Sequence, residues 1–449
     1  MSKDIRIKKG LNISLVGEAA QTTTQHTTGG FYAIKPSDFH GVTVKLIAKE
    51  GTEVKAGEPL FYSKSDERIL FPSPVSGKVT EVIRGERRKV LAINIAANAT
   101  QEFKDFGAKD AASMSAEEVK NHLLASGCWP FVKQRPYDVV ANPNQAPKAI
   151  FVSAYASAPL AADLDYTLKG KEATLQAALT AVGKLTEGKL HVSVGKNANS
   201  PFSNLEGIEL HKVSGPHPIG NVGTQIAHID PINKGEVVWV ITPQDLLVIG
   251  ELLLTGKFNI TRTLALTGSQ FRKPHYVTVT AGAQIAPLVK GNLNNDNTRI
   301  ISGNVLSGSQ VEEEGFVGYY DKQITAIPEG DDYEFFGWNK PVFNKISTSR
   351  ALTFSWLTPK KKYDLNTNTN GEHRAFVVTG SYEKVFPLDL YPMQLLKACM
   401  YKDLDEMEAL GAYEVAPEDF ALTEFICVSK QPHQKIIREG LDLMREELG

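Results

Sequence analysis

Residues 214–224 hold the residue types best suited to binding a ligand, and they read Ser-Gly-Pro-His-Pro-Ile-Gly-Asn-Val-Gly-Thr. Glycines let a backbone turn sharply and approach a ligand closely, while prolines stiffen the turn. Because a strand-like run at 207–213 leads into it, the stretch could form a phosphate- or flavin-binding loop. Its glycine spacing is neither Gly-x-Gly-x-x-Gly nor a P-loop, so, taken alone, an ordinary strand-to-helix turn is the simpler interpretation. The candidate contact residues are Gly215, Pro216, His217, Pro218, Gly220 and Gly223.

The three cysteines, Cys128, Cys399 and Cys427, lie far apart in the sequence and form no Cys-x-x-Cys pair. Zinc sites and iron–sulfur clusters held by cysteine need several thiolates at short spacing. The sequence therefore predicts no metal centre and no cofactor held by cysteines in this chain, and it also disfavours a disulfide framework. No residue pattern marks a catalytic group.

Composition and charge are those of an ordinary folded protein without a nucleic-acid partner. The chain has 449 residues, which predicts roughly three domains, with 42% apolar and 22% charged residues. Its net charge of −2 provides no basic field for nucleic acid. The apolar runs fall far short of the ~20 residues that cross a bilayer, and the start, Met-Ser-Lys-Asp-Ile-Arg, does not resemble a leader peptide. We therefore expect a cytoplasmic location.

Residues 1–100 form a predicted β domain, in which short strand-like runs alternate with Gly and Pro. The segments 49–60 and 71–82 resemble the two halves of a biotinyl/lipoyl-type domain, a flattened β-sandwich hybrid. In that family, a lysine on the hairpin between the halves carries the cofactor. Counting back from the Ser-Gly pair at 76–77 puts Asp66 at this position, with Lys64 out of register. A carboxylate cannot form the amide bond to biotin or lipoate, so we expect a structural module without the carrier lysine.

Residues 101–255 combine a connector with a Rossmann-like α/β domain. In the connector, Ser113 or Ser115 caps a helix that Gly127 ends, and residues 128–137 read as irregular. Farther on, strand-like runs alternate with helical patterns, which predicts a mainly parallel sheet covered on both faces. The strand-like runs are 148–153, 189–194, 208–213 and 237–241, and the helical ones are 170–185 and 243–253. Alanines replace the fingerprint glycines after the first strand, so we expect no NAD binding of the usual kind.

The last two predicted domains are a small β-rich domain at 256–338 and a mainly helical domain at 339–449. Residues 432–448 have the spacing of an amphipathic helix. We expect its apolar stripe to pack on the domain core and not on a membrane, because its polar face mixes both charges. The stripe consists of Ile437, Leu441, Met444 and Leu448. The whole sequence therefore predicts a multidomain α+β chain.

Short stretches spread along the whole chain resemble the A subunit of the bacterial sodium-translocating NADH:quinone oxidoreductases. They are residues 35–41, 72–77, 84–88, 135–137, 214–224, 244–245, 299–308, 337–338, 382–388 and 417–422. Each stretch alone is weak, but their order along the chain is specific. The resemblance implies a translocase complex that oxidises NADH, reduces ubiquinone or menaquinone and exports sodium ions. This chain would be its peripheral subunit on the cytoplasmic face, in contact with the membrane B subunit, and the flavins, the iron–sulfur centre and the NADH site would belong to other subunits.

The resemblance extends to the C subunit of the Rnf complex and, more distantly, to the FMN- and NADH-binding subunit of respiratory complex I. These relatives place a ligand-binding β-grasp (SLBB-type) domain after a Rossmann-like domain, which matches 256–335 after 130–255 here. The Rnf subunit carries two ferredoxin-type cysteine clusters in its C-terminal region. Here only Cys399 and Cys427 remain, and two thiols cannot hold a four-iron cluster. We expect a related helical domain without clusters and without electron relay by metal.

Three functions follow from these resemblances. The first is a subunit without a cofactor that supports assembly and the quinone site, and the second is an electron-input subunit that binds flavin or NADH. The third is a biotin or lipoyl carrier, which Asp66 argues against. A quinone ring needs an apolar slot and one or two donors. The loop around His217, with Trp239 and Phe271, could supply them, as could a subunit interface, but a satisfied imidazole that stiffens the turn is the favoured role of His217.

Overall fold

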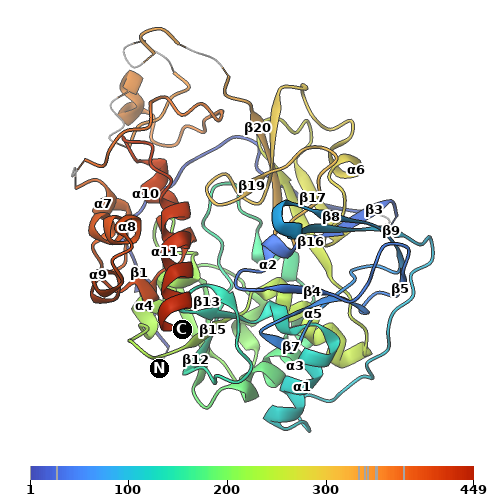
Figure 1. Ribbon diagram of the computed structural model, residues 1–449. Coiled ribbons are helices and arrows are strands. Elements are labelled where there is room, and N and C mark those ends of the chain that lie inside the picture. Colours follow the sequence, from blue (N-terminus) through green and yellow to red (C-terminus); the bar gives the residue numbers. More distant parts are fainter. Residues whose placement is uncertain are drawn as a thin grey trace.

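The computed structural model describes residues 2–26, 29–331, 334–337, 340, 343–348, 352–377 and 380–449. Four sheets and a group of C-terminal helices make up the described chain (Figure 1). The predicted boundary at residue 338 lies outside the described residues. Within the described ranges, no helix is both long enough and apolar enough to cross a bilayer.

The first β domain consists of a four-stranded and a three-stranded sheet. The first has the order β3 (Phe31–Ile34), β9 (Val90–Ala97), β8 (Gly77–Arg84) and β5 (Glu53–Val54). The second has the order β4 (Val44–Leu46), β6 (Pro59–Ser63) and β7 (Asp66–Pro72). Alternate side chains point inward, and Phe61 stacks on Phe71 with ring centroids 4.5 Å apart. Aromatic burial of this kind supplies most of the cohesion of a small β core.

The α/β domain contains the predicted parallel sheet, covered on both faces. Its strands follow the order β1 (Asp4–Arg6), β14 (Glu209–Ser214), β13 (Lys189–Gly195), β12 (Ala149–Ser153), β15 (Val238–Val240), β10 (Lys133–Arg135) and β11 (Val139–Val140). The first five run parallel, whereas β10 is antiparallel to β15 and to β11. The prediction of an irregular segment at 128–137 is therefore wrong for β10. Its Lys-Gln-Arg sequence lacks the apolar alternation that marks a strand.

Helices flank this sheet on two sides, and Figure 1 shows α3 and α5 together on one side and α4 on the other. Ile150 and Val152 of β12 belong to the same hydrophobic cluster as residues of α3 (Glu172–Val182) and α5 (Pro243–Thr255). Phe151 belongs instead to the cluster that contains residues of α4 (Val222–Ile229). This alternation is the expected consequence of successive strand side chains pointing to opposite faces.

Two helix starts in this domain are confirmed at the level of single hydrogen bonds. Ser115 caps α1 (Ala116–Ser126) in a capping box with Glu118, and Gly127 ends the helix in the left-handed conformation. Thr242 caps α5, with proline at the first helical position. The remaining helix, α2 (Leu164–Leu168), is one short segment between β12 and α3.

Two strands within residues 2–25 pair with strands far away in the sequence. Strand β1 lies parallel to β14 in the α/β sheet, and β2 (Ala20–Gln25) lies parallel to β17 in the third domain. Figure 1 shows β1 near α4 and the C-terminal helices, apart from β3, β8 and β9. The sequence placed residues 1–25 in the first β domain, since pairing between distant strands leaves no local signal.

The third sheet lies mainly in the region predicted as a small β-rich domain. Its order is β19 (Ser309–Gln310), β18 (Thr298–Ser302), β20 (Gln323–Pro328), β16 (Thr261–Thr267), β17 (His275–Thr280) and β2. The short helix α6 (Ala286–Val289) lies in the connection from β17 to β18. Strands β16 and β20 are parallel, while β17 and β18 run antiparallel to their neighbours β16 and β20.

The C-terminal region is helical, as expected. It contains α7 (Tyr382–Val385), α8 (Pro392–Tyr401), α9 (Leu404–Ala409), α10 (Ala421–Phe425) and α11 (His433–Leu448). The predicted cap Asp403 accepts a hydrogen bond from the amide of Glu406 at the start of α9. Of the predicted stripe on α11, Ile437, Leu441 and Met444 are buried, whereas Leu448, in the last helical turn, is exposed.

Candidate functional site

The loop 215–221 connects β14 to α4 at the carboxyl end of the parallel strands, where ligands of doubly wound sheets bind. His217 lies within it and is only 3% exposed. Its Nδ1 lies 3.0 Å from Ser157 Oγ, which also accepts a hydrogen bond from the Gly220 amide at 2.8 Å. The Ser157 hydroxyl therefore contacts both the Gly220 amide and the His217 ring, and it joins the two ends of the loop contact. Burial lowers the pKa of His217 to about 4, so the ring is neutral near pH 7.

Gly220 is the position at which the loop touches the end of β12. A Cβ at Gly220 would lie 2.6 Å from the amide nitrogen of Ser157, so no larger residue fits without displacement. The Ser153 hydroxyl donates to the Gly220 carbonyl at 2.8 Å, and the Gln225 side chain donates to Ser153 Oγ at 2.8 Å. At β12 the strand order reverses, which is the usual ligand edge. Here, protein hydrogen bonds tie the loop to that edge.

Gly223 lies against a buried ion pair between the α/β domain and the helical region. Arg135 of β10 donates to Asp419 at 2.9 Å and to Glu418 at 2.7 Å. The side chains of Arg135 and Asp419 are 2% and 0% exposed, respectively. A Cβ at Gly223 would collide with both Arg135 and Asp419. Three stretches that carry the family resemblance, 135–137, 214–224 and 417–422, thus meet at one contact.

Sequence reasoning identified these three stretches but missed that they meet. Arg135, Glu418 and Asp419 do not form a recognisable motif in the sequence. Arg135 and Asp419 are separated by 284 positions. A single sequence carries no signal for such a long-range pair.

Gly215 and Pro216 line an open cavity of about 570 Å³ between β1 and the loop. Gly215 has φ +136°, and a Cβ there would lie 2.6 Å from the carbonyl oxygen of Ile7, so glycine is required. The other lining residues are Arg6, Ile7, Lys8, Lys196 and Ser214. Pro218 follows His217 through a cis peptide bond. Five of the six predicted contact residues, all except Pro218, therefore divide between this cavity, the Ser157 contact and the Arg135 contact.

The two apolar residues proposed beside His217 lie elsewhere. Trp239 packs edge-on against Trp129 with ring centroids 5.3 Å apart. Phe271 pairs with Leu293, and both Trp239 and Phe271 belong to the main hydrophobic cluster. Ile219, next to the cis proline, belongs to a different cluster. The structure does not bring the three proposed quinone-slot residues together.

The cysteines are chemically unsuited to holding a metal. All three are buried and free, and burial raises the pKa of Cys128 and of Cys399 to about 12. Metals and iron–sulfur clusters bind the thiolate, so a thiol with a raised pKa is a poor ligand. Cys427 shares a hydrogen bond of 2.9 Å with the Tyr382 hydroxyl.

A different group, His191, Glu209 and His211, was not predicted and has ligand atoms within 4.8 Å of one another. The Lys3 amide donates to His211 Nδ1 at 3.0 Å, which leaves the proton of this neutral ring on Nε2. Nε2 lies 3.0 Å from His191 Nδ1 and donates to it. Lys189 pairs with Glu209. Hydrogen bonds therefore already use the Nδ1 lone pairs of both histidines, and the Glu209 carboxylate is held in an ion pair.

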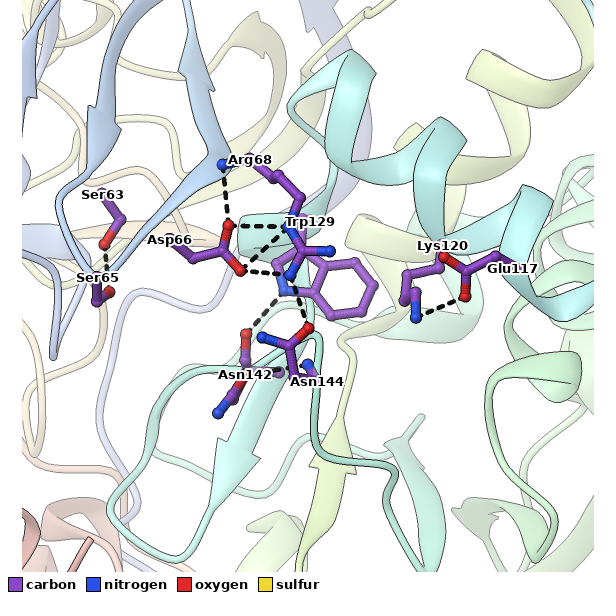
Figure 2. Close-up of polar contacts among 10 residues, drawn as sticks. Ser63, Ser65, Asp66, Arg68, Glu117, Lys120, Trp129, Asn142 and Asn144 are labelled. Atoms are coloured by element: carbon purple, nitrogen blue, oxygen red, sulfur yellow. Dashed lines mark hydrogen bonds and ion pairs between the residues drawn. The ribbon is translucent and has the colours of Figure 1, made fainter.

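In the first domain, the hairpin between β6 and β7 places Lys64 and Ser65 on the turn and Asp66 at the first residue of β7. Figure 2 shows the Asp66 carboxylate facing Arg68, which in turn reaches Asn144. The Arg68 hydrogen bonds lower the pKa of Asp66. The position selected by counting is thus an ion-paired carboxylate at the edge of the turn, and Lys64 is an exposed turn residue.

Three family models match most of the chain. Residues 5–98 match the NqrA N-terminal barrel-sandwich hybrid domain, residues 114–258 the NqrA second alpha/beta domain, and residues 263–313 the NQRA C-terminal domain. Among solved structures, an NAD+-reducing [NiFe]-hydrogenase aligns over 64% of this chain and 54% of its own, with 9% identity and a TM-score of 0.34. A score this low carries no argument about this chain.

Curated relatives cover the whole chain. The A subunit of the Na(+)-translocating NADH-quinone reductase of Neisseria meningitidis serogroup B is 36% identical over 99% of this chain and 100% of its own. The A subunit of the Haemophilus influenzae enzyme is 35% identical over the same shares. That of Rhodopirellula baltica is 34% identical over 98% of each chain. The chain therefore belongs to the A-subunit family of the Na(+)-translocating NADH-quinone reductases, and is a component of that enzyme.

Proposed function

We propose that this chain is the peripheral subunit on the cytoplasmic face of the sodium-translocating NADH:quinone reductase, and that it supports assembly and the quinone site without a redox centre of its own. The observation that carries this proposal is the 36% identity to the Neisseria relative over 99% of this chain and 100% of that relative. Similarity from end to end is expected of chains that occupy the same position in one kind of complex.

The proposal that this chain holds no redox centre rests on the chemistry of its residues. The buried thiols of Cys128 and Cys399 have raised pKa values. At the ligand edge of the parallel sheet, Ser153, Ser157 and Gln225 bind the protein's own loop. Electrons then pass only through cofactors of other subunits.

The proposed role of the loop is to hold two domains in the arrangement that the membrane B subunit recognises. His217 is buried and cannot itself contact a partner or a quinone at the surface. Its hydrogen bond to Ser157 fixes the loop, and Gly223 of the helix that follows leaves room for the Arg135–Asp419 pair. The loop thus acts on the quinone site through the shape of the subunit.

Two measurements test the proposal. The absorption spectrum of the purified chain should lack a visible flavin band, and a stoichiometric band would identify an electron-input subunit instead. Photo-reactive quinone labelling of the assembled complex tests the quinone site. Labelled peptides from this chain would place it at the quinone site. Labels confined to other subunits would mean that this chain serves only as a scaffold.

A variant separates the loop's role from simple turn formation. We expect His217→Ala to lower quinone reduction or assembly of the complex, while NADH oxidation by an artificial acceptor is unchanged. If both quinone reduction and assembly stay at the wild-type level, residues 214–224 are only a structural turn.

A further inference from the structure

The open cavity beside the loop lies at the carboxyl ends of three adjacent parallel strands. Arg6 ends β1, Ser214 ends β14, and Lys196 follows directly after β13. The volume of about 570 Å³ is that of a small-molecule site. This is the edge at which parallel sheets bind ligands, and the proposed function leaves the cavity unused.

Positive charge dominates the lining, since all three of its charged residues are cations: Arg6, Lys8 and Lys196. Lys196 pairs with Asp4 at 2.7 Å, and both side chains are about half exposed. No ion pair of Arg6 or Lys8 is found within the described part of the chain. Two cations are thus left to neutralise a bound anion.

The strand pattern explains why these charges face the cavity. Ile5 and Ile7 of the N-terminal segment are buried in the α/β core, 6% and 5% exposed. Arg6 and Lys8 alternate with them, so their side chains point to the opposite side. Burial of the two isoleucines therefore places both cations on the exposed side of this segment.

The cavity walls are held by the backbone. The Ile7 amide donates to the Ser214 carbonyl at 3.1 Å, and the Leu11 amide donates to the His217 carbonyl at 2.9 Å. The His217 amide donates to the Asn12 side chain at 2.9 Å. With Gly215 packed on the Ile7 carbonyl, the segment from Ile7 to Asn12 is joined to the loop along its length. A wall built in this way is ordered before a ligand arrives, which reduces the entropic cost of binding.

We propose that this cavity binds a phosphate group, with Arg6 and Lys8 as its main ligands and Lys196 as the third. Guanidinium pairs with two phosphate oxygens at once, and an ammonium adds a point charge. The two unpaired cations match the charge of a phosphate dianion. The group could belong to a small phosphate compound or to a phospholipid headgroup at the membrane surface.

Binding to the full-length purified chain tests this site. The soluble probes are ADP and inorganic pyrophosphate, titrated by calorimetry. The membrane probe is a vesicle of phosphatidylglycerol in phosphatidylcholine, assayed by flotation against vesicles of phosphatidylcholine alone. The test variant is Arg6→Gln/Lys8→Gln. The control is Arg88→Gln/Lys89→Gln, which removes the same two charge types from the exposed β8–β9 connection.

We expect at least one probe to bind the wild-type chain. The test variant should lower the affinity for that probe about tenfold or more, and the affinity of the control variant should be close to that of the wild type. Saturable binding of ADP or pyrophosphate identifies a small phosphate compound, and binding of anionic vesicles alone identifies a lipid headgroup. In either case, the binding affinity should fall as the salt concentration is raised. The proposal is overturned if no probe binds, or if the test and control variants lose affinity equally. An unchanged melting temperature of the test variant shows that any loss is not unfolding.

Discussion

Replacing Arg135 by leucine should loosen the helical region from the α/β domain. The change removes the cation that pairs with Asp419 at 2.9 Å and with Glu418 at 2.7 Å. Asp419 is 0% exposed and would keep one hydrogen bond, from the Ala416 amide at 2.9 Å. Removing one partner of a buried pair costs about 3–5 kcal/mol, because the other charge stays buried. We expect the lower end, about 3 kcal/mol, since Glu418 is partly exposed and regains water.

Hydrogen exchange of the amides in α10 and α11 measures this opening locally, which matters because a chain of several domains does not unfold in one step. A loss of about 3 kcal/mol corresponds to exchange roughly a hundredfold faster. The apolar double variant Arg135→Met/Asp419→Leu should recover part of the protection, because no charge is left buried although the Ala416 amide loses its acceptor.

Lys234→Met is the matched control. Lys234 also joins the α/β domain to the helical region, through Glu408 at 2.9 Å, but its side chain is 72% exposed. Exposed pairs contribute little, so exchange should stay near the wild-type rate. Equal protection in Arg135→Leu and Lys234→Met would refute the claim that the buried pair holds the domains together.

Three further outcomes follow from the same contacts. The pKa of His217 falls from 6.5 to about 4 on folding, so its contribution to stability is present above about pH 6.5 and is lost as the pH falls towards 4. His217→Gln should reduce the acid-induced loss of stability by up to about 3 kcal/mol, measured as melting temperature against pH, and an unchanged profile would contradict the burial argument. Gly220→Ala should destabilise the chain by about 1–3 kcal/mol, because its Cβ would lie 2.6 Å from the Ser157 amide. Gly183→Ala is the control, because Gly183 has φ −60° and a Cβ there would have its nearest contact at 3.9 Å, so this change should not destabilise the chain. Similar chemical denaturation curves for the two variants would refute the claim that Gly220 has no room for a Cβ. The intact mass should equal the sequence mass, whereas an adduct on Lys64 would restore the carrier function that Asp66 argues against.

Local signals predicted much of the fold. Capping residues and apolar periodicity are short-range properties. They predicted Thr242 as the cap of α5, and they limited the cap of α1 to Ser113 or Ser115, of which Ser115 is the cap. The strands β12 and β13 were predicted to within one residue because buried parallel strands are nearly continuous apolar runs.

Long-range pairing explains most of the failures. Strand β1 pairs with a strand 208 residues farther along the chain, and β2 pairs with one 253 to 255 residues farther along. No property of residues 4–25 reveals those partners. The same limit applies to the candidate site. The sequence indicated that the glycines of the loop allow a turn. In the structure, glycine is needed at these positions because a Cβ would collide with Ile7, Ser157 or the Arg135–Asp419 pair. Only the assembled structure supplies those neighbours.

The most direct test of the proposed function is removal of this chain from the complex in membranes, followed by its return. Quinone reduction by NADH and sodium export should both be lost without it and restored with it. The flavin and iron–sulfur content of the remaining subunits should be unchanged throughout. Quinone reduction at the wild-type rate without this chain, or loss of a flavin together with it, would contradict the account.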